Sequence, residues 1–149
     1  IDFINAKGYI EKDYGKSFPK DYLWLQCNDF VNDDMSIMVS IAHIPFLGFK
    51  FKGCIAVVYY EGKEYRLATY NRVKIISYSE KGLIINRGIY QLEVEINNLS
   101  PQSLLAPCKG DMKRKIYENI KCAARFKFYI KEKLVFDFYS SNTSFEYVK

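Results

Sequence analysis

The 149-residue chain, with 49% hydrophobic residues, is long enough for a single domain, residues 1–149, that contains a real hydrophobic core. It shows no signal-peptide pattern and no apolar run of the ~18 residues that a transmembrane helix needs, so both are excluded. Four cysteines without a Cys-x-x-Cys pair and a single histidine predict reduced thiols in a cytoplasmic protein, and argue against a metal site or a cofactor.

The formal net charge of +5 and the 17% of aromatic residues are compatible with a nucleic-acid binder. However, the basic residues alternate with apolar ones, as in Arg125-Phe126-Lys127-Phe128. This alternation is typical of strands with one wet face, and no recognition motif accompanies the charge. We therefore expect no nucleic-acid partner.

The first informative segment contains two acids, Glu11 and Asp13, on either side of Lys12. If the segment is extended, both carboxyl groups point to one side and Lys12 points to the other. Like charges at this distance raise each other's pKa, and apolar neighbours such as Tyr14 and Phe18 would raise it further. A carboxyl group that stays protonated near neutral pH can transfer a proton. The alternative is a pair of solvated acids on a lysine-rich loop.

Residues 22–30 follow as a predicted strand that mixes large aromatic and carboxamide side chains on one face. Alternation places Leu23, Leu25 and Cys27 on the opposite face. The mixed face consists of Tyr22, Trp24, Gln26, Asn28 and Phe30. Unpaired amide groups are costly in a dry core and natural in a binding cavity. The alternative is that Gln26 and Asn28 bind neighbouring backbone groups.

The rest of the chain reads as short strands separated by glycine turns. The predicted strands are 36–44, 51–60, 65–69, 73–78, 83–86, 91–97, 125–131 and 134–139, with turns at Glu61-Gly62, Lys81-Gly82 and Arg87-Gly88. A loop is expected over residues 97–103, whereas residues 111–124 fit a helix and a strand equally well. So many short strands predict an all-β sandwich or barrel with little helix.

Several motifs are similar to those of the tocopherol cyclase family. The specific one is Glu11-Lys12, Asp13, Tyr14, Gly15, Phe18-Pro19 and the strand from Trp24 to Asn28; shorter likenesses are residues 61–71 and Leu104 to Pro107. The resemblance implies an antiparallel lipocalin-like barrel and a strand at residues 111–124. It also implies an upstream domain in a longer, two-domain protein. Two positions depart from the usual pattern, since Asp13 replaces an Asn and Tyr14 a Trp.

The resemblance further implies an intramolecular lyase that protonates an alkene of a prenyl quinol and closes a chromanol ring. Such chemistry needs a proton donor, aromatic rings beside the cation and polar groups for the quinol head. Our candidates for these roles are Glu11 or Asp13 as donor, Tyr14 and Trp24 beside the cation, and Gln26 and Asn28, with Lys12 nearby, as ligand-binding residues.

The expected partner is thus a hydrophobic small molecule, a prenyl quinol or another isoprenoid. Because such a substrate is a lipid, we also expect a peripheral contact of the protein with a membrane. Two alternatives stay open from the sequence. One is a lipocalin-like module that binds a hydrophobic ligand without converting it. The other is a structural domain that packs its Trp24 face against an upstream barrel.

Overall fold

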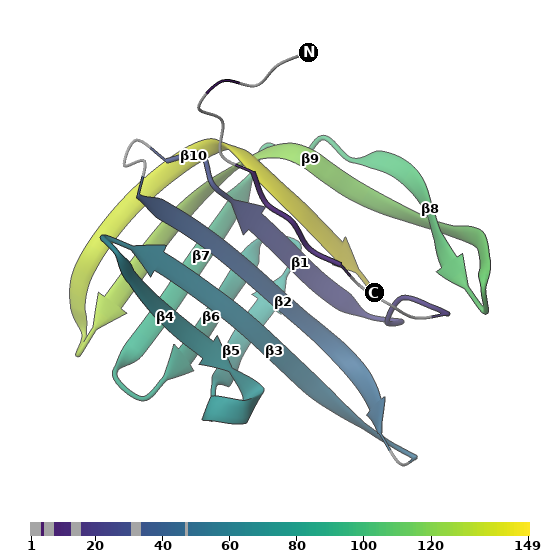
Figure 1. Cartoon of the computed structure of the whole chain (residues 1–149), viewed down its shortest axis with the longest axis horizontal. Helices are drawn as coiled ribbons and strands as arrows, with labels where there is room; N and C mark the ends of the chain where they lie inside the picture. Colours follow the sequence, from purple (N-terminus) through teal and green to yellow (C-terminus); the bar gives the residue numbers. More distant parts are fainter. Residues whose placement is uncertain (1–3, 5–7, 13–15, 31–33, 47) are drawn as a thin grey trace.

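A computed structural model shows ten antiparallel strands among the residues that it describes, which are all except 1–3, 5–7, 13–15, 31–33 and 47 (Figure 1). The strands are β1 (Tyr22–Cys27), β2 (Met35–Phe46), β3 (Phe49–Tyr60), β4 (Lys63–Ala68), β5 (Lys74–Ser79), β6 (Gly82–Arg87), β7 (Tyr90–Asn97), β8 (Gln102–Cys108), β9 (Asp111–Ile130) and β10 (Lys133–Val148). The helical content of the described chain is a single 3-10 turn, η1 (Thr69–Asn71). None of the described segments is a helix long and apolar enough to cross a membrane.

The strands form one sheet in the order β4-β3-β2-β1-β10-β9-β7-β6-β5, and β8 extends it beside β9. The sheet bends so strongly that β4 comes close to β6, and β2 to β4 lie across from β5 to β7 in Figure 1. Its end strands, β4 and β5, are not hydrogen-bonded to each other within the described residues, so the sheet is curled but not closed. The all-β antiparallel prediction is confirmed, in its strongly bent form.

Apolar side chains fill the inside of the curl. Among the fully buried residues are Leu23 and Leu25 of β1 and Phe126 and Phe128 of β9. The ring of Tyr65 on β4 lies 5.1 Å from that of Phe128, which joins the two sides of the bent sheet. Packed aromatic rings of this kind stabilise a core beyond their buried area. The space where a lipocalin-like ligand would bind is therefore occupied by the protein's own core.

Irregular pairing between β9 and β10 reverses which residues face the core. The register shifts between Ser140 and Thr143 and again before Phe145. Before the shift, even-numbered Phe136 is buried in the core, and after it odd-numbered Phe145 is. An extra residue in one strand has this effect because side chains alternate with a period of two. As a result Glu146 points to the outer face of the sheet.

The strand predictions hold for the most part, and the ambiguous residues 111–124 belong to strand β9. Strand β8 was not predicted, since Leu104 to Pro107 lack alternation and contain a proline. That proline is tolerated because β8 pairs with β9 alone among the described strands and Pro107 stands at a register shift in that pairing.

Of the predicted turns, Glu61-Gly62 is confirmed, with the positive φ angles of 49° and 72° that a type I′ turn requires. The other two lie one residue away, since Ser79 pairs with Gly82 and Arg87 with Tyr90. Gly82 has a different role: a Cβ there would lie 1.9 Å from the carbonyl oxygen of Val94, so only glycine fits.

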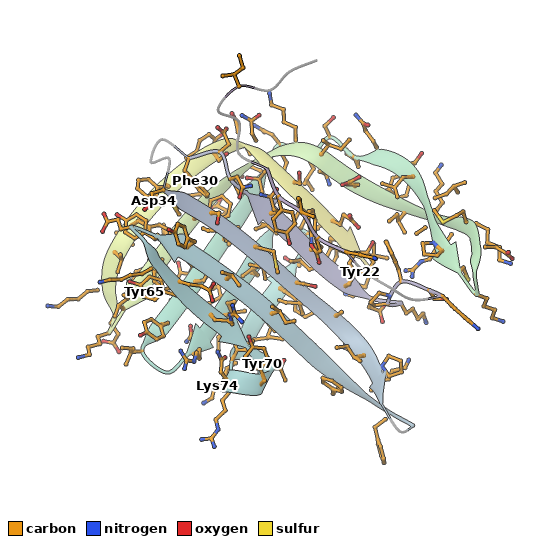
Figure 2. The ribbon with its side chains drawn as sticks, viewed as in Figure 1. Tyr22, Phe30, Asp34, Tyr65, Tyr70 and Lys74 are labelled. Carbon is orange, nitrogen blue, oxygen red and sulfur yellow. The ribbon has the colours of Figure 1, made fainter. Side chains whose placement is uncertain are left out.

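One face assignment was wrong. Strand β1 ends at Cys27, so the alternation that begins at Tyr22 does not continue to Phe30. Phe30 turns into the core, where its ring lies 5.2 Å from that of Phe126. Figure 2 shows Tyr22 and Phe30 at opposite ends of β1. The predicted reduced state of the thiols agrees with the structure, in which all four cysteines are free.

Candidate functional site

The segment before β1, residues 8–12 and 16–21, covers part of the outer face of the sheet and is hydrogen-bonded to the β8–β9 hairpin. We call it the covering segment. The Phe18 amide donates to the carbonyl oxygen of Pro107 (3.4 Å), and the Gly110 amide to that of Lys16 (2.8 Å). The Arg114 guanidinium donates to two consecutive carbonyl oxygens of the segment, those of Pro19 and Lys20. These bonds bring the first motif and the Leu104–Pro107 motif together, although they are far apart in sequence.

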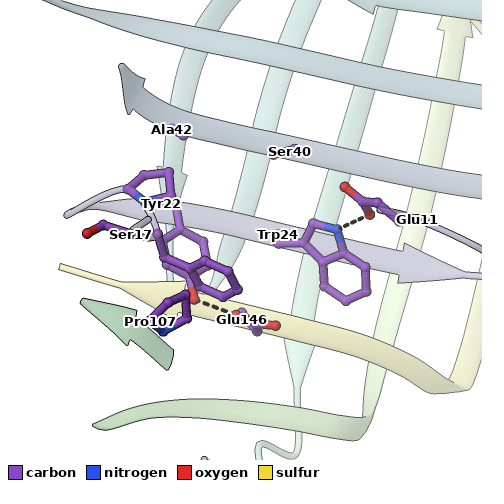
Figure 3. A pocket seen from close by; sticks show the side chains of 10 residues that line it. Glu11, Ser17, Tyr22, Trp24, Ser40, Ala42, Pro107 and Glu146 are labelled. Carbon is purple, nitrogen blue, oxygen red and sulfur yellow. Dashed lines mark hydrogen bonds between the residues drawn. The ribbon is translucent and has the colours of Figure 1, made fainter. Parts of the chain in front are cut away.

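Between this segment and the sheet lies a pocket of about 470 Å³ (Figure 3). Its lining residues are Glu11, Ser17, Phe18, Pro19, Tyr22, Trp24, Ser40, Ala42, Pro107 and Glu146. Strand pairing explains part of this grouping, because Trp24 stands opposite Ser40 on one side and Glu146 on the other. The pocket therefore lies on the outer face of β1, behind the core rather than inside it.

At one end of the pocket the Glu11 carboxylate is held by two aromatic residues. The Trp24 indole N–H donates to Oε2 of Glu11 at 2.9 Å, and the Tyr9 hydroxyl donates to the same oxygen at 2.7 Å. The Tyr9 and Trp24 rings are 6.2 Å apart. Glu11 itself is exposed, so this carboxylate stays in contact with water.

At the other end lies a second, less accessible carboxyl group. Tyr22 is only 7% exposed, and its hydroxyl donates to Oε2 of Glu146 at 2.5 Å. Burial raises the pKa of Glu146; the Tyr22 hydrogen bond lowers it, and the nearby Glu118 and Glu11 carboxylates raise it. Burial and the bond to Glu146 likewise raise the pKa of Tyr22. This end of the pocket thus favours a neutral carboxylic acid.

The predicted site residues separate into three groups. Glu11 and Trp24 line the pocket and are hydrogen-bonded to each other. Lys12 is exposed, and Gln26 and Asn28 are half-buried, but none of these three lines the pocket. Asp13 and Tyr14 lie outside the described residues, so their roles stay predictions.

Sequence reasoning missed Glu146 and its neighbours. Residues 145–147 alternate, but the bulge before them hides which side faces the core. The pairing of Glu118 with Glu146 across β9 and β10 also depends on that irregular register. No local pattern links Tyr22 to a carboxylate 124 residues later.

A metal-assisted site has no geometric support in the described part of the chain, where no three His, Cys, Asp or Glu side chains are grouped to hold an ion. The pocket instead offers two carboxyl groups, a phenol and an indole. Such a set can bind a phenolic head group, place rings beside a cation and move a proton.

A family model described as tocopherol cyclase-like matches residues 1–146, which is almost the whole chain. No solved structure matches the chain.

Proposed function

The chain belongs to the tocopherol cyclase-like family, and from this premise we propose that it binds a prenylated hydroquinone and closes its chromanol ring. The observation that carries the proposal is the pocket, which places carboxyl groups beside aromatic rings on one sheet face. Family membership alone gives neither substrate nor reaction. The pocket supplies the groups that this chemistry requires.

The reaction is an isomerisation, so nothing besides the substrate is consumed. A carboxyl group gives its proton to the less substituted carbon of a trisubstituted alkene, and the π electrons form the new C–H bond. The phenol oxygen then attacks the tertiary cation and forms the C–O bond, and the phenol proton leaves to a carboxylate. The rings of Trp24 and Tyr22 stabilise the cation through their faces.

A prenyl hydroquinone incubated with the protein in D2O tests the reaction. Substrate and product have the same mass in ordinary water, so they are separated by chromatography and distinguished by the number of phenolic hydroxyls. In D2O, proton-initiated closure adds one carbon-bound deuterium to the chromanol. A product without this deuterium, or no product at high protein concentration, would refute the proposed reaction.

The alternative is a module that binds a hydrophobic ligand and does not convert it. The filled interior argues against a ligand inside the curl, so such a ligand would also occupy the outer pocket. Saturation binding of the hydroquinone without chromanol formation would favour this second function.

We also propose that the β2–β3 hairpin makes the membrane contact through which a lipid substrate arrives. Phe49 is 79% exposed and Ile44 40% exposed near the end of this hairpin, and Lys50, next to Phe49, is also exposed. Exposed apolar side chains beside a cation suit an anionic lipid surface. The hairpin extends beyond the rest of the sheet in Figure 1. Strand β2 also lines the pocket, with Ser40 and Ala42.

A further inference from the structure

We infer that Glu146 is the proton donor of the ring closure and that Tyr22 positions it, an inference that rests on the proposed cyclisation. The two residues lie at the end of the pocket that Phe18 and Pro107 also line: the Phe18 ring packs edge-on against that of Tyr22 at 6.2 Å, and Pro107 lies beside Tyr22 and Glu146 in Figure 3. Glu11, a donor candidate from the sequence, lies at the exposed end. A cation formed beside Glu146 is better protected from water.

Cross-strand pairing fixes the position of Glu146. It stands directly between Trp24 of β1 and Glu118 of β9 in the register of the sheet. One neighbour supplies a ring for the developing cation, and the other supplies a like charge that opposes ionisation. The Tyr22 hydroxyl, 124 residues away in sequence, donates a hydrogen bond to the Glu146 carboxyl group.

Taken together, the groups around Glu146 disfavour its ionised form. The groups that face it are Tyr22 from β1, Glu118 from β9 and Glu11 from the covering segment. Arg114 is the nearby cation, but its guanidinium donates to backbone carbonyl oxygens of that segment. Burial raises the pKa of Glu146 and the two carboxylates raise it further, which favours the protonated form that a proton donor needs.

The donor step balances within one residue. The Glu146 O–H bond breaks as the alkene carbon takes the proton, and the resulting carboxylate faces the tertiary cation. After the phenol oxygen has formed the C–O bond, this carboxylate takes the phenol proton and becomes an acid again. Tyr22 stays hydrogen-bonded to the other oxygen and transfers no proton.

Isosteric substitution tests the donor. Glu146→Gln is expected to lower kcat by about 100-fold or more with little change in KM, because general acid catalysis contributes roughly that much. Glu95→Gln, an exposed glutamate on β7, is the matched control and is expected to be unchanged. A kcat of Glu146→Gln within a few-fold of wild type would overturn the inference.

The pH profile separates catalysis from a structural role. Since turnover requires protonated Glu146, its alkaline limb follows the pKa of that group. Tyr22→Phe removes a bond that lowers this pKa and should move the limb to higher pH. Glu118→Gln removes a like charge and should move it to lower pH. Limbs that do not move in these opposite directions would contradict the assignment.

A cation analogue gives a readout that needs no turnover. A prenyl hydroquinone with a tertiary amine in place of the cationic carbon should bind wild type more than tenfold tighter than Glu146→Gln. If wild type binds the amine in this way but forms no chromanol, the proposed cyclisation fails while the placement of Glu146 beside the cation stands. Equal binding to both proteins overturns the placement, and no binding to either overturns both proposals.

Discussion

At the scale of single residues, the outer face of β1 concentrates unusual groups in a small area. A carboxylic acid, a phenol and an indole meet where a sheet would ordinarily present solvated side chains. The pairing of Glu146 opposite Glu118 is unfavourable in itself, because like charges directly across two strands repel. Groups that cost stability at one place are typical of a functional site.

The stability of the protein should depend on pH through Glu146. Its folded-state pKa is raised above the ordinary 4.5, so the folded state binds the proton more tightly than the unfolded state. Stability is therefore lost as pH rises from the ordinary pKa through the raised one. At pH 7 Glu146→Gln should unfold at a higher temperature than wild type, because it lacks the cost of an ionised Glu146 in the folded state. Each kcal/mol of that cost corresponds to about 2–4 °C in unfolding temperature. At pH 4 the two proteins should unfold at nearly the same temperature. Thermal unfolding followed by circular dichroism measures both; a stabilisation that is larger at pH 4 than at pH 7 would disprove the direction.

Trp24, the single tryptophan, should report ligand binding. Its indole lines the pocket and donates to Glu11, so a bound hydroquinone should change its fluorescence. Trp24→Ala should weaken binding by about 1 kcal/mol or more, since the ring contacts ligand. Titration by calorimetry measures the loss, and Tyr139→Ala, an exposed aromatic on β10 that does not line the pocket, is the control. A ligand that binds wild type without any change in Trp24 emission would argue against contact.

At the scale of elements, the sequence predicts regular strands well and irregular ones poorly. Leu92, Val94 and Ile96 alternate without interruption, and strand β7 forms where that alternation predicts it. Glu146 could not be assigned to a face from the sequence, because no local pattern marks the extra residue near Ser141 that reverses the alternation of β10. Trp24 was placed on the correct face, but the segment that makes this face a pocket is joined to it by distant hydrogen bonds.

The alternation that follows the bulge in β10 should be essential because it sets the face of every later residue in the strand. Deletion of Ser144, between Thr143 and Phe145, would shift this alternation by one, so Phe145, 1% exposed, would turn outward and Glu146 would turn into the core. We expect a loss of about 4 kcal/mol or more, or failure to fold, as for a large buried side chain that is removed. Denaturant unfolding measures this, with Ser141→Ala as the neutral control. A deletion variant with wild-type stability would show that the strand can take another register.

The β2–β3 hairpin should bind anionic lipid. Phe49→Ser should lower partitioning onto vesicles that contain phosphatidylserine by roughly tenfold, because burial of the ring is worth about 1.5–3 kcal/mol. Lys50→Gln should lower it by a few-fold, since one basic residue contributes about 1 kcal/mol. Co-sedimentation measures both, and Lys133→Gln, an exposed lysine at the start of β10, is the control. Unchanged partitioning of Phe49→Ser would place the contact elsewhere.

At the scale of the whole molecule, the decisive contrast is between the inside of the curl and its outer face. The lipocalin-like resemblance suggested an internal ligand, whereas the inside is packed with side chains such as Phe126 and Phe128. The pocket lies instead where the covering segment and the β8–β9 hairpin meet the back of the sheet. The inside of the strongly bent sheet is thus the packed core, and its outer face carries the pocket.

Two substitutions separate these two regions. Ser40→Trp should fill the outer pocket and abolish hydroquinone binding with little effect on unfolding, because Ser40 lines the pocket and not the core. Phe128→Leu should lower stability by about 1–3 kcal/mol through imperfect packing, yet leave the affinity unchanged in the folded protein. Calorimetric titration and thermal unfolding of each variant give both quantities. The opposite pattern, with binding lost in folded Phe128→Leu and kept in Ser40→Trp, would place the ligand inside the curl. The expected pattern requires the ligand to approach from the outer face, the side on which Ser40, Trp24 and Glu146 stand in one row across the sheet.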